Sequence, residues 1–185
     1  MVESVGRIFV ATGFPSEVRA AIEDRLATVS LPGRRVDSAD WHITLRFLGD
    51  IAVVAFERLL AALDERRLPP PFELRLGGLG AFPQARQAAV VWVGLEEGTA
   101  GLRGLQEEVE QACEGVGLGR EQRPFRPHVT LSRIRPPSDV RRLVDQFPPL
   151  GIRSPVGEVV VLRSHLQPDG PRYEPLERFA MDRSG

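Results

Sequence analysis

The chain has 185 residues, of which 42% are hydrophobic, a formal net charge of −1 and a single cysteine. Its longest apolar runs, "AAVVWVGL" and "VVVLRSHL", are far shorter than the roughly 20 residues that cross a bilayer, which excludes a transmembrane helix, and one cysteine excludes a disulfide framework. The first residues lack the pattern of a secretory signal, so we expect a soluble cytoplasmic protein with no membrane partner.

The first half of the chain predicts three strands and two helices. "RIFVATGFP" predicts a strand that ends at Gly13 and Pro15, and "PSEVRAAIEDRLATV" has apolar residues at helical spacing. After a turn-rich segment, "WHITLRFLGD" predicts the strand that carries His42. "VVAFERLLAALDERR" predicts a second amphipathic helix, which the prolines at 69–71 end, and "FELRLGGLG" alternates as a strand does.

The second half repeats this order. It predicts the strand "AAVVWVGL", the helix "TAGLRGLQEEVEQACEG", a strand that carries His128, a short helix near "PSDVRRLVDQF" entered through Pro136 and Pro137, and the strands "GEVVVLRSHL" and "YEPLERFAM". The two opening strands lie about 82 residues apart and the two histidines 86, as a duplication predicts. We therefore expect one domain over 1–185 with two lobes, approximately 1–83 and 84–185.

Two of the three histidines begin the same pattern, "HITL" at His42 and "HVTL" at His128. Alternate side chains of a strand share a face, so His42 and Thr44 are predicted to point one way while their apolar neighbours point into the core. The same holds for His128 and Thr130. Lobes related by a twofold axis would bring two histidines and two threonines to one cleft.

These residue types suit in-line displacement at phosphorus. An imidazole can hold or release a proton near neutral pH, so a facing pair can supply a base for attacking water and an acid for the departing oxygen. Threonine hydroxyls can donate to the non-bridging phosphate oxygens. By strand alternation Arg46 and Arg126 fall on the histidine faces, whereas Arg133 does so only if its strand ends or bulges. Seven arginines against two acidic residues between 120 and 142 favour a phosphate-bearing ligand.

Other interpretations of these residues are weaker. A duplicated structural strand also explains a repeated histidine, but both halves keep a polar pair aimed the same way. No third histidine, cysteine or carboxylate stands at the spacing of a zinc site, so no metal is predicted. His165 is predicted to be structural, and Cys113 to be buried within a helix. Core packing rather than base stacking is expected for four aromatic residues: Trp41, Trp92, Phe47 and Tyr173.

Nearly end to end, the chain resembles the two-histidine (2H) phosphoesterases, and within them the bacterial and archaeal RNA 2′,3′-cyclic phosphodiesterases, also known as 2′-5′ RNA ligases. "RIFVATGFP" is similar to the family's opening strand, "WHITLRFLGDI" and "RPFRPHVTLSRI" to its two signatures, and "VVVLRSHLQPDGPRYEPLERF" to its closing strands. The resemblance implies a bilobal α+β fold of two pseudo-symmetric halves, each with an antiparallel sheet and helices, and an active-site cleft between the lobes.

The resemblance also implies that water opens a 2′,3′-cyclic phosphate to a 2′-phosphate without metal or cofactor. His128 would activate the water, His42 would protonate the departing 3′ oxygen, and Thr44 and Thr130 would hold the phosphate, although on the sequence alone the two histidines are interchangeable. Ligation to a 2′-5′ linkage would be the reverse reaction. The candidate substrate-binding residues are Arg46, Arg126, Arg133 and Ser132, the last of which stands where alanine is usual in the family.

The expected partner is RNA with a 2′,3′-cyclic phosphate end, with tRNA fragments as one candidate, and a monomer is expected. Two alternatives stay open. One is a cyclic phosphodiesterase that acts on small nucleotides such as ADP-ribose cyclic phosphate, and the other is a protein that binds RNA or nucleotides without catalysis.

Overall fold

Nine strands and four α-helices make up the residues that the computed structural model describes, 3–168 and 170–181. The strands are β1 (Ser4–Gly13), β2 (Arg34–Arg35), β3 (His42–Ala52), β4 (Phe72–Phe82), β5 (Ala88–Glu97), β6 (Val129–Ser138), β7 (Arg153–Val156), β8 (Glu158–Gln167) and β9 (Gly170–Ala180). The α-helices are α1 (Ser16–Leu26), α2 (Val53–Asp64), α3 (Thr99–Gly115) and α4 (Arg141–Gln146). Short 3₁₀ helices precede β3 and β5, namely η1 (Ser38–Asp40) and η2 (Ala85–Gln87).

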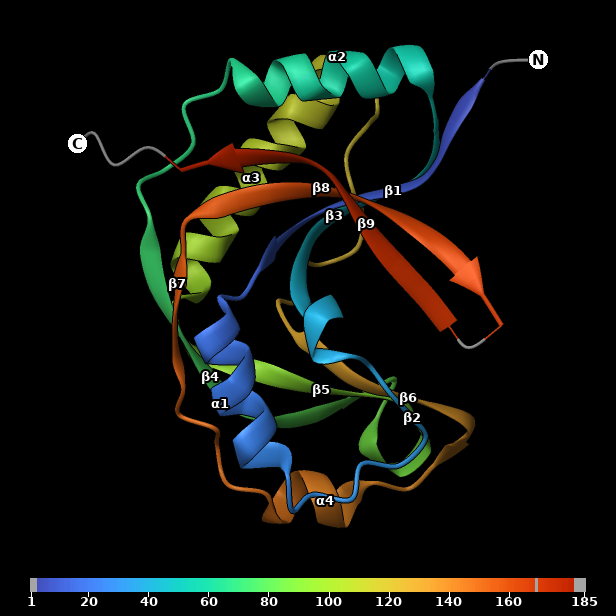
Figure 1. The fold of residues 1–185 in the computed structure, drawn as a ribbon, viewed down its shortest axis with the longest axis vertical. Coiled ribbons are helices and arrows are strands. Elements are labelled where there is room, and N and C mark those ends of the chain that lie inside the picture. The colour runs from blue at the N-terminus through green and yellow to red at the C-terminus, as the bar shows by residue number, and fades with distance from the viewer. Residues whose placement is uncertain (1–2, 169, 182–185) are drawn as a thin grey trace.

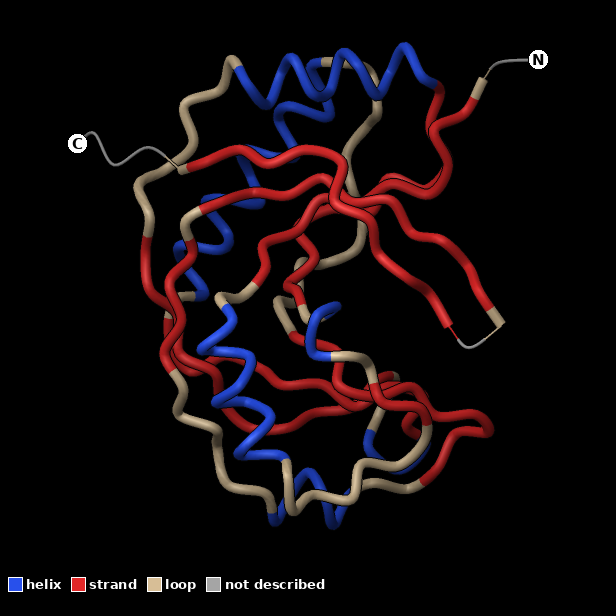
Figure 2. The backbone as a smooth tube through the Cα atoms, viewed as in Figure 1, coloured by secondary structure: helices blue, strands red, loops and turns tan. Residues whose placement is uncertain are grey.

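All nine strands belong to one antiparallel sheet (Figures 1 and 2). Its order is β7-β4-β5-β6-β3-β1-β8-β9, and β2 pairs with β6. At the centre of this order, β3 and β6 are joined by a single residue pair, Ile43 with Val129. The sheet is therefore nearly divided into a β3 part (β1, β3, β8 and β9) and a β6 part (β2, β4, β5, β6 and β7).

Each part of the sheet is built from both halves of the chain. β4, from the first half, pairs with β5 and β7 in the β6 part, whereas β8 and β9, from the second half, lie beside β1 in the β3 part. The α+β fold with two antiparallel lobes is confirmed. The boundary near residue 83, however, does not separate the lobes, because β4 and β8 pair with strands of the other half and β9 pairs with β8. Alternation in the sequence identifies a strand but not the strand that it pairs with.

Helices cover both parts of the sheet (Figure 1). α2 and α3 pack against each other and against β3, and α4 packs against β4. The face of α3 that is buried follows helical spacing, with Leu102, Leu105 and Val109 in the core. The buried apolar residues of helices and strands form one continuous cluster that extends through both parts of the sheet.

The predicted elements differ from the observed ones mainly at short segments. α3 has the bounds that its apolar spacing predicts, but the helix expected after Pro136 and Pro137 begins only at Arg141. β6 instead continues through both prolines, so that Ser138 pairs with Ala88 at the end of β5. β2 and β7, of two and four residues, are too short to show alternation. In the described part of the chain, no helix combines the length and apolar character needed to cross a membrane.

Candidate active site

The two strands that carry the repeated pattern meet at the junction of the sheet. His42 begins β3 and His128 directly precedes β6, next to the single pair that joins these strands. Their apolar neighbours are buried, as alternation predicts. Both histidines, Thr44 and Thr130 line one pocket of about 230 Å³. The structure thus brings together the two histidines and two threonines that the sequence singles out.

Both imidazoles are held by the same local hydrogen bond. Nδ1 of His42 lies 2.7 Å from the carbonyl oxygen of Asp40, and Nδ1 of His128 lies 2.6 Å from that of Arg126, in each case two residues earlier. A carbonyl oxygen only accepts, so Nδ1 carries the proton and donates it. Nε2 is therefore the nitrogen left to exchange a proton with a ligand, and the two histidines are equivalent in this respect.

Aromatic rings pack against both histidines and fix their orientation. The ring of His42 lies 5.0 Å from that of Phe9 and 5.1 Å from that of Tyr173, the latter edge to face. The ring of His128 lies 4.9 Å from that of Phe82, also edge to face, and 5.9 Å from that of Trp92. Rings at these separations are in favourable contact, so each imidazole is wedged at a defined position.

Burial lowers the pKa of both histidines. The pKa of His42 falls to about 4 because its imidazole is removed from water, and the charges of His128 and Arg133 lower it further against the hydrogen bond to Asp40. Burial also lowers the pKa of His128, again with a contribution from Arg133 and against the hydrogen bond to Arg126. Both imidazoles are therefore neutral at pH 7 in the free protein.

A bulge follows the threonine in each strand and reverses the alternation. Between β1 and β3 the register shifts between Thr44 and Arg46, and between β5 and β6 it shifts between Thr130 and Ser132. One extra residue in a strand turns the following side chains to the opposite face. The fifth residue after each histidine, Phe47 and Arg133, consequently lines the pocket.

The same bulges place Arg46 in the core, so the prediction that it shares the face of His42 is wrong. Its Nε lies 3.5 Å from a carboxylate oxygen of Glu110 and its Nη1 lies 3.4 Å from Glu121, while its Nη2 donates to the carbonyl of Gly119 at 3.2 Å. The side chain is 8% exposed, and that of Glu110 1%. Ser132, at the matching position of β6, is fully buried and does not line the pocket either.

Most of the arginines between 120 and 142 are neutralised by carboxylates or lie away from the pocket. Arg120 pairs with Glu107 and Glu114, and two others pair within the segment, Arg123 with Glu121 and Arg141 with Asp139. The side chain of Arg126 is exposed and does not line the pocket; its carbonyl oxygen holds His128. Arg133 is the member of this group that reaches the two histidines, since the bulge turns it inward.

The remaining candidates lie away from this pocket or line it unexpectedly. His165 bonds Glu174 at 2.7 Å between β8 and β9, and Cys113 is buried in α3, where burial raises its thiol pKa to about 11. Trp41 is buried as predicted, but Phe47 and Tyr173 line the pocket, and Phe47 is 57% exposed. Among the described residues, no group of three or more histidine, cysteine or acidic side chains is arranged to hold a metal ion.

Comparisons with known proteins extend over most of the chain. The family model described as the 2′-5′ RNA ligase superfamily matches residues 14–168. An RNA 2′,3′-cyclic phosphodiesterase of Aeropyrum pernix is 35% identical over 174 residues, covering 90% of this chain and 96% of that protein. Another, of Thermus thermophilus, is 36% identical over 187 residues, covering 95% and 90%. The crystal structure of Escherichia coli LigT complexed with 3′-AMP has a TM-score of 0.80 at 31% identity, over 97% of this chain and 99% of that one.

Proposed function

The chain belongs to the 2′-5′ RNA ligase superfamily, and we propose on this basis that it hydrolyses the 2′,3′-cyclic phosphate at the end of an RNA to a 2′-phosphomonoester. The observation that carries the proposal is the pair of equivalently held imidazoles, His42 and His128, on one pocket with Thr44 and Thr130. Relatives named RNA 2′,3′-cyclic phosphodiesterases match this chain over nearly their whole length and support the same activity.

Each step of this reaction has a group in the pocket to carry it out. Nε2 of one histidine takes a proton from water as the water oxygen bonds to phosphorus, and Nε2–H of the other protonates the 3′ oxygen as the phosphorus–oxygen bond breaks. The family resemblance gives His128 as the base and His42 as the acid, whereas the pKa of about 4 at His42 places the single proton of the free pair on His128, which makes His128 the acid and His42 the base. The steps are the same for either assignment, because the two rings are held equivalently. Thr44 and Thr130 donate hydrogen bonds to the non-bridging oxygens, and Arg133 supplies positive charge as negative charge accumulates there. One histidine gains a proton and the other loses one, so a single proton transfer between them restores the starting protonation of the pair.

The environment of the pocket supports a nucleotide ligand. Phe47 exposes most of its ring on the same face as the histidines, and aromatic rings at such sites stack on unpaired bases. The solved relative binds 3′-AMP, a ribonucleotide with its phosphate at the 3′ position. Hydrolysis without metal, 2′-5′ ligation as the reverse reaction, tRNA fragments as substrates, and a cytoplasmic monomer remain predictions within this proposal.

The direct test uses an oligonucleotide that ends in a 2′,3′-cyclic phosphate, incubated with the protein and EDTA. We expect hydrolysis at the rate seen without chelator and a 2′-monoester as the product, identified by chromatography against 2′- and 3′-phosphate standards. A 3′-monoester would show that the other ester bond breaks. Activity that EDTA removes and a divalent metal restores would contradict the metal-free mechanism, and binding without turnover would favour the non-catalytic alternative.

The pH dependence of kcat/KM is expected to be bell-shaped and displaced to acid pH. The active form holds one proton on the histidine pair, because below about pH 4 His42 is also protonated and no base remains. Above the lowered pKa of His128 neither ring is protonated and no acid remains, so the alkaline limb begins below the ordinary histidine value of about 6.5.

A bound phosphate diester moves this alkaline limb, because its negative charge favours the protonated imidazoles and raises their pKa values. The limb of kcat, which reports on the complex, should therefore lie at higher pH than the limb of kcat/KM, which reports on the free protein. Steady-state kinetics over the full pH range measures both profiles. Coincident limbs near neutral pH would contradict buried histidines of lowered pKa.

A further inference from the structure

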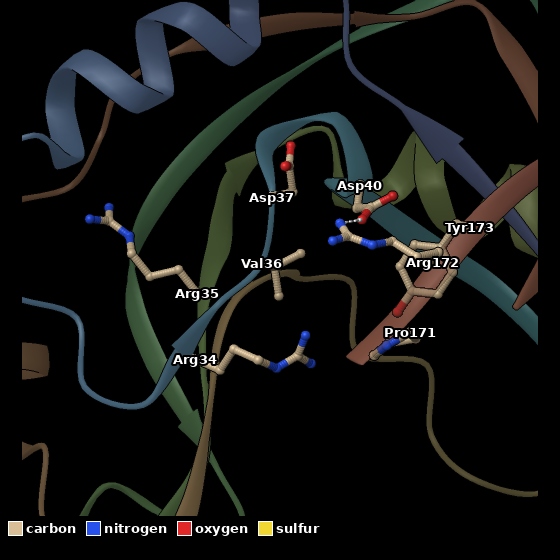
Figure 3. A pocket seen from close by; sticks show the side chains of 8 residues that line it. All are labelled: Arg34, Arg35, Val36, Asp37, Asp40, Pro171, Arg172 and Tyr173. Carbon is tan, nitrogen blue, oxygen red and sulfur yellow. Dashed lines mark ion pairs between the residues drawn. The ribbon is translucent and has the colours of Figure 1, made fainter. Parts of the chain in front are cut away.

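A second pocket, of about 320 Å³, adjoins the one that holds the histidines (Figure 3). Both pockets are lined by Val36, Asp40 and Tyr173, so a chain molecule can extend from one into the other without leaving the surface. The second pocket adds three arginines, Arg34, Arg35 and Arg172. Sequence patterns do not point to Arg34 or Arg172, because β2, which carries Arg34, is only two residues long, and Arg172 lies in β9 just before the strand "YEPLERFAM" that the sequence predicts.

Arg34 and Arg172 reach the second pocket from different parts of the sheet. Arg34 lies in β2, opposite Arg133 of β6, and Arg172 lies in β9 of the β3 part. Figure 3 shows both guanidinium groups pointing toward the same space, whereas that of Arg35 points away. Gly170 permits this approach, because a Cβ atom at that position would overlap the guanidinium of Arg34.

The second pocket is also connected to the catalytic histidine through Asp40. Nη1 of Arg172 lies 4.0 Å from a carboxylate oxygen of Asp40, and the carbonyl oxygen of Asp40 accepts the Nδ1 proton of His42. Burial raises the pKa of the Asp40 carboxyl, together with the charge of Asp37, and Arg172 opposes this rise. Arg172 therefore contacts the residue that holds His42, whereas Arg34 lines the second pocket and not the pocket of the histidines.

We propose that Arg34 and Arg172 bind the phosphodiester on the 5′ side of the terminal nucleotide, which makes an RNA strand of two or more nucleotides the preferred substrate over a cyclic mononucleotide. This inference rests on the proposed function and names its substrate class. With the cyclic phosphate between the histidines, the 5′ oxygen of the same nucleotide leads to the next phosphate, and the adjoining pocket is where the strand can continue. Guanidinium groups match phosphate oxygens with two parallel hydrogen bonds, and such contacts position a strand without reading its sequence.

The test compares two substrates of the same base, a dinucleotide that ends in a 2′,3′-cyclic phosphate and the matching cyclic mononucleotide. In the wild type, kcat/KM should be at least about tenfold higher for the dinucleotide, since a hydrogen bond to a charged group is worth about 1.5–3 kcal/mol. Arg34→Gln should reduce this preference about tenfold. Arg35→Gln is the matched control, because it removes the same charge from a residue of the same pocket whose guanidinium group points away from Arg34 and Arg172 (Figure 3), and it should keep the wild-type preference.

The salt dependence of the wild type gives a second measurement that needs no variant. Each phosphate contact to a single strand contributes a slope of about −0.7 to the logarithm of affinity against the logarithm of salt concentration, so the dinucleotide should show a slope steeper by about that amount. Equal kcat/KM and equal slopes for the two substrates would overturn the inference and leave the proposed function intact, as would equal losses in the Arg34→Gln and Arg35→Gln variants. Hydrolysis of neither substrate would instead refute the proposed function itself.

Discussion

Replacing His42 or His128 with alanine is expected to lower kcat for a 2′,3′-cyclic phosphate by at least about 100-fold, the usual contribution of a positioned general acid or base. Either change removes one of the two proton-transfer groups while Thr44, Thr130 and Arg133 remain to hold the phosphate. Binding of a nucleotide monophosphate, measured by calorimetry, should therefore survive in both variants. Loss of turnover with retained binding separates a catalytic role from a merely structural one.

The third histidine provides the matched control for these variants. His165 is exposed, bonds Glu174 at 2.7 Å and does not line the pocket, so His165→Ala should keep the wild-type kcat. The double variant of His42 and His128 should be little worse than either single variant, because the two rings act as a unit. Turnover at the wild-type rate in either single variant would rule out acid–base catalysis by this pair.

Replacing Arg46 with methionine is expected to reduce the free energy of unfolding by about 3 kcal/mol. Removal of one partner from a buried ion pair leaves the other charge without compensation in the core, which typically costs about 3–5 kcal/mol. The distances of 3.5 Å to Glu110 and 3.4 Å to Glu121 favour the lower end of this range. Urea denaturation followed by circular dichroism measures the loss.

A second substitution distinguishes this structural role of Arg46 from the phosphate contact that strand alternation predicts. The double variant Arg46→Met with Glu110→Leu removes both buried charges, so it should regain a large part of the lost stability. KM of the folded Arg46→Met protein should match that of the wild type. A raised KM with unchanged stability would return Arg46 to the substrate site.

Sequence patterns predict this site correctly up to the bulge in each histidine strand, and they fail at the next residue, Arg46 in β3 and Ser132 in β6. Over the four residues of each pattern, "HITL" and "HVTL", alternation predicts the correct faces. His42, Thr44, His128 and Thr130 line the pocket, and their apolar neighbours are buried. Alternation fails at the next residue because a bulge adds one residue to the strand there. No residue type in "HITLRF" or "HVTLSR" indicates the position of a bulge.

The other differences arise from contacts between distant parts of the chain. Glu107 and Glu114 neutralise Arg120 from α3, so the arginine-rich segment has far less free charge than its sequence indicates. β4 lies in the β6 part of the sheet and β8 and β9 in the β3 part because of the strands with which they pair. The alternation of residues within a strand does not depend on its neighbour, so it cannot predict this pairing. The resemblance of the chain to a family supplies the candidate catalytic residues, but the position of the second pocket comes from the assembled sheet.

The exchange of strands also determines where this molecule can be divided. A break near residue 83 leaves one fragment with His42 but without β8 and β9, and another with His128 but without β4. Each fragment would present long unpaired strand edges, which associate with other strands. Both histidine strands therefore depend on an intact chain, because each half supplies strands that complete the part of the sheet around the other half's histidine.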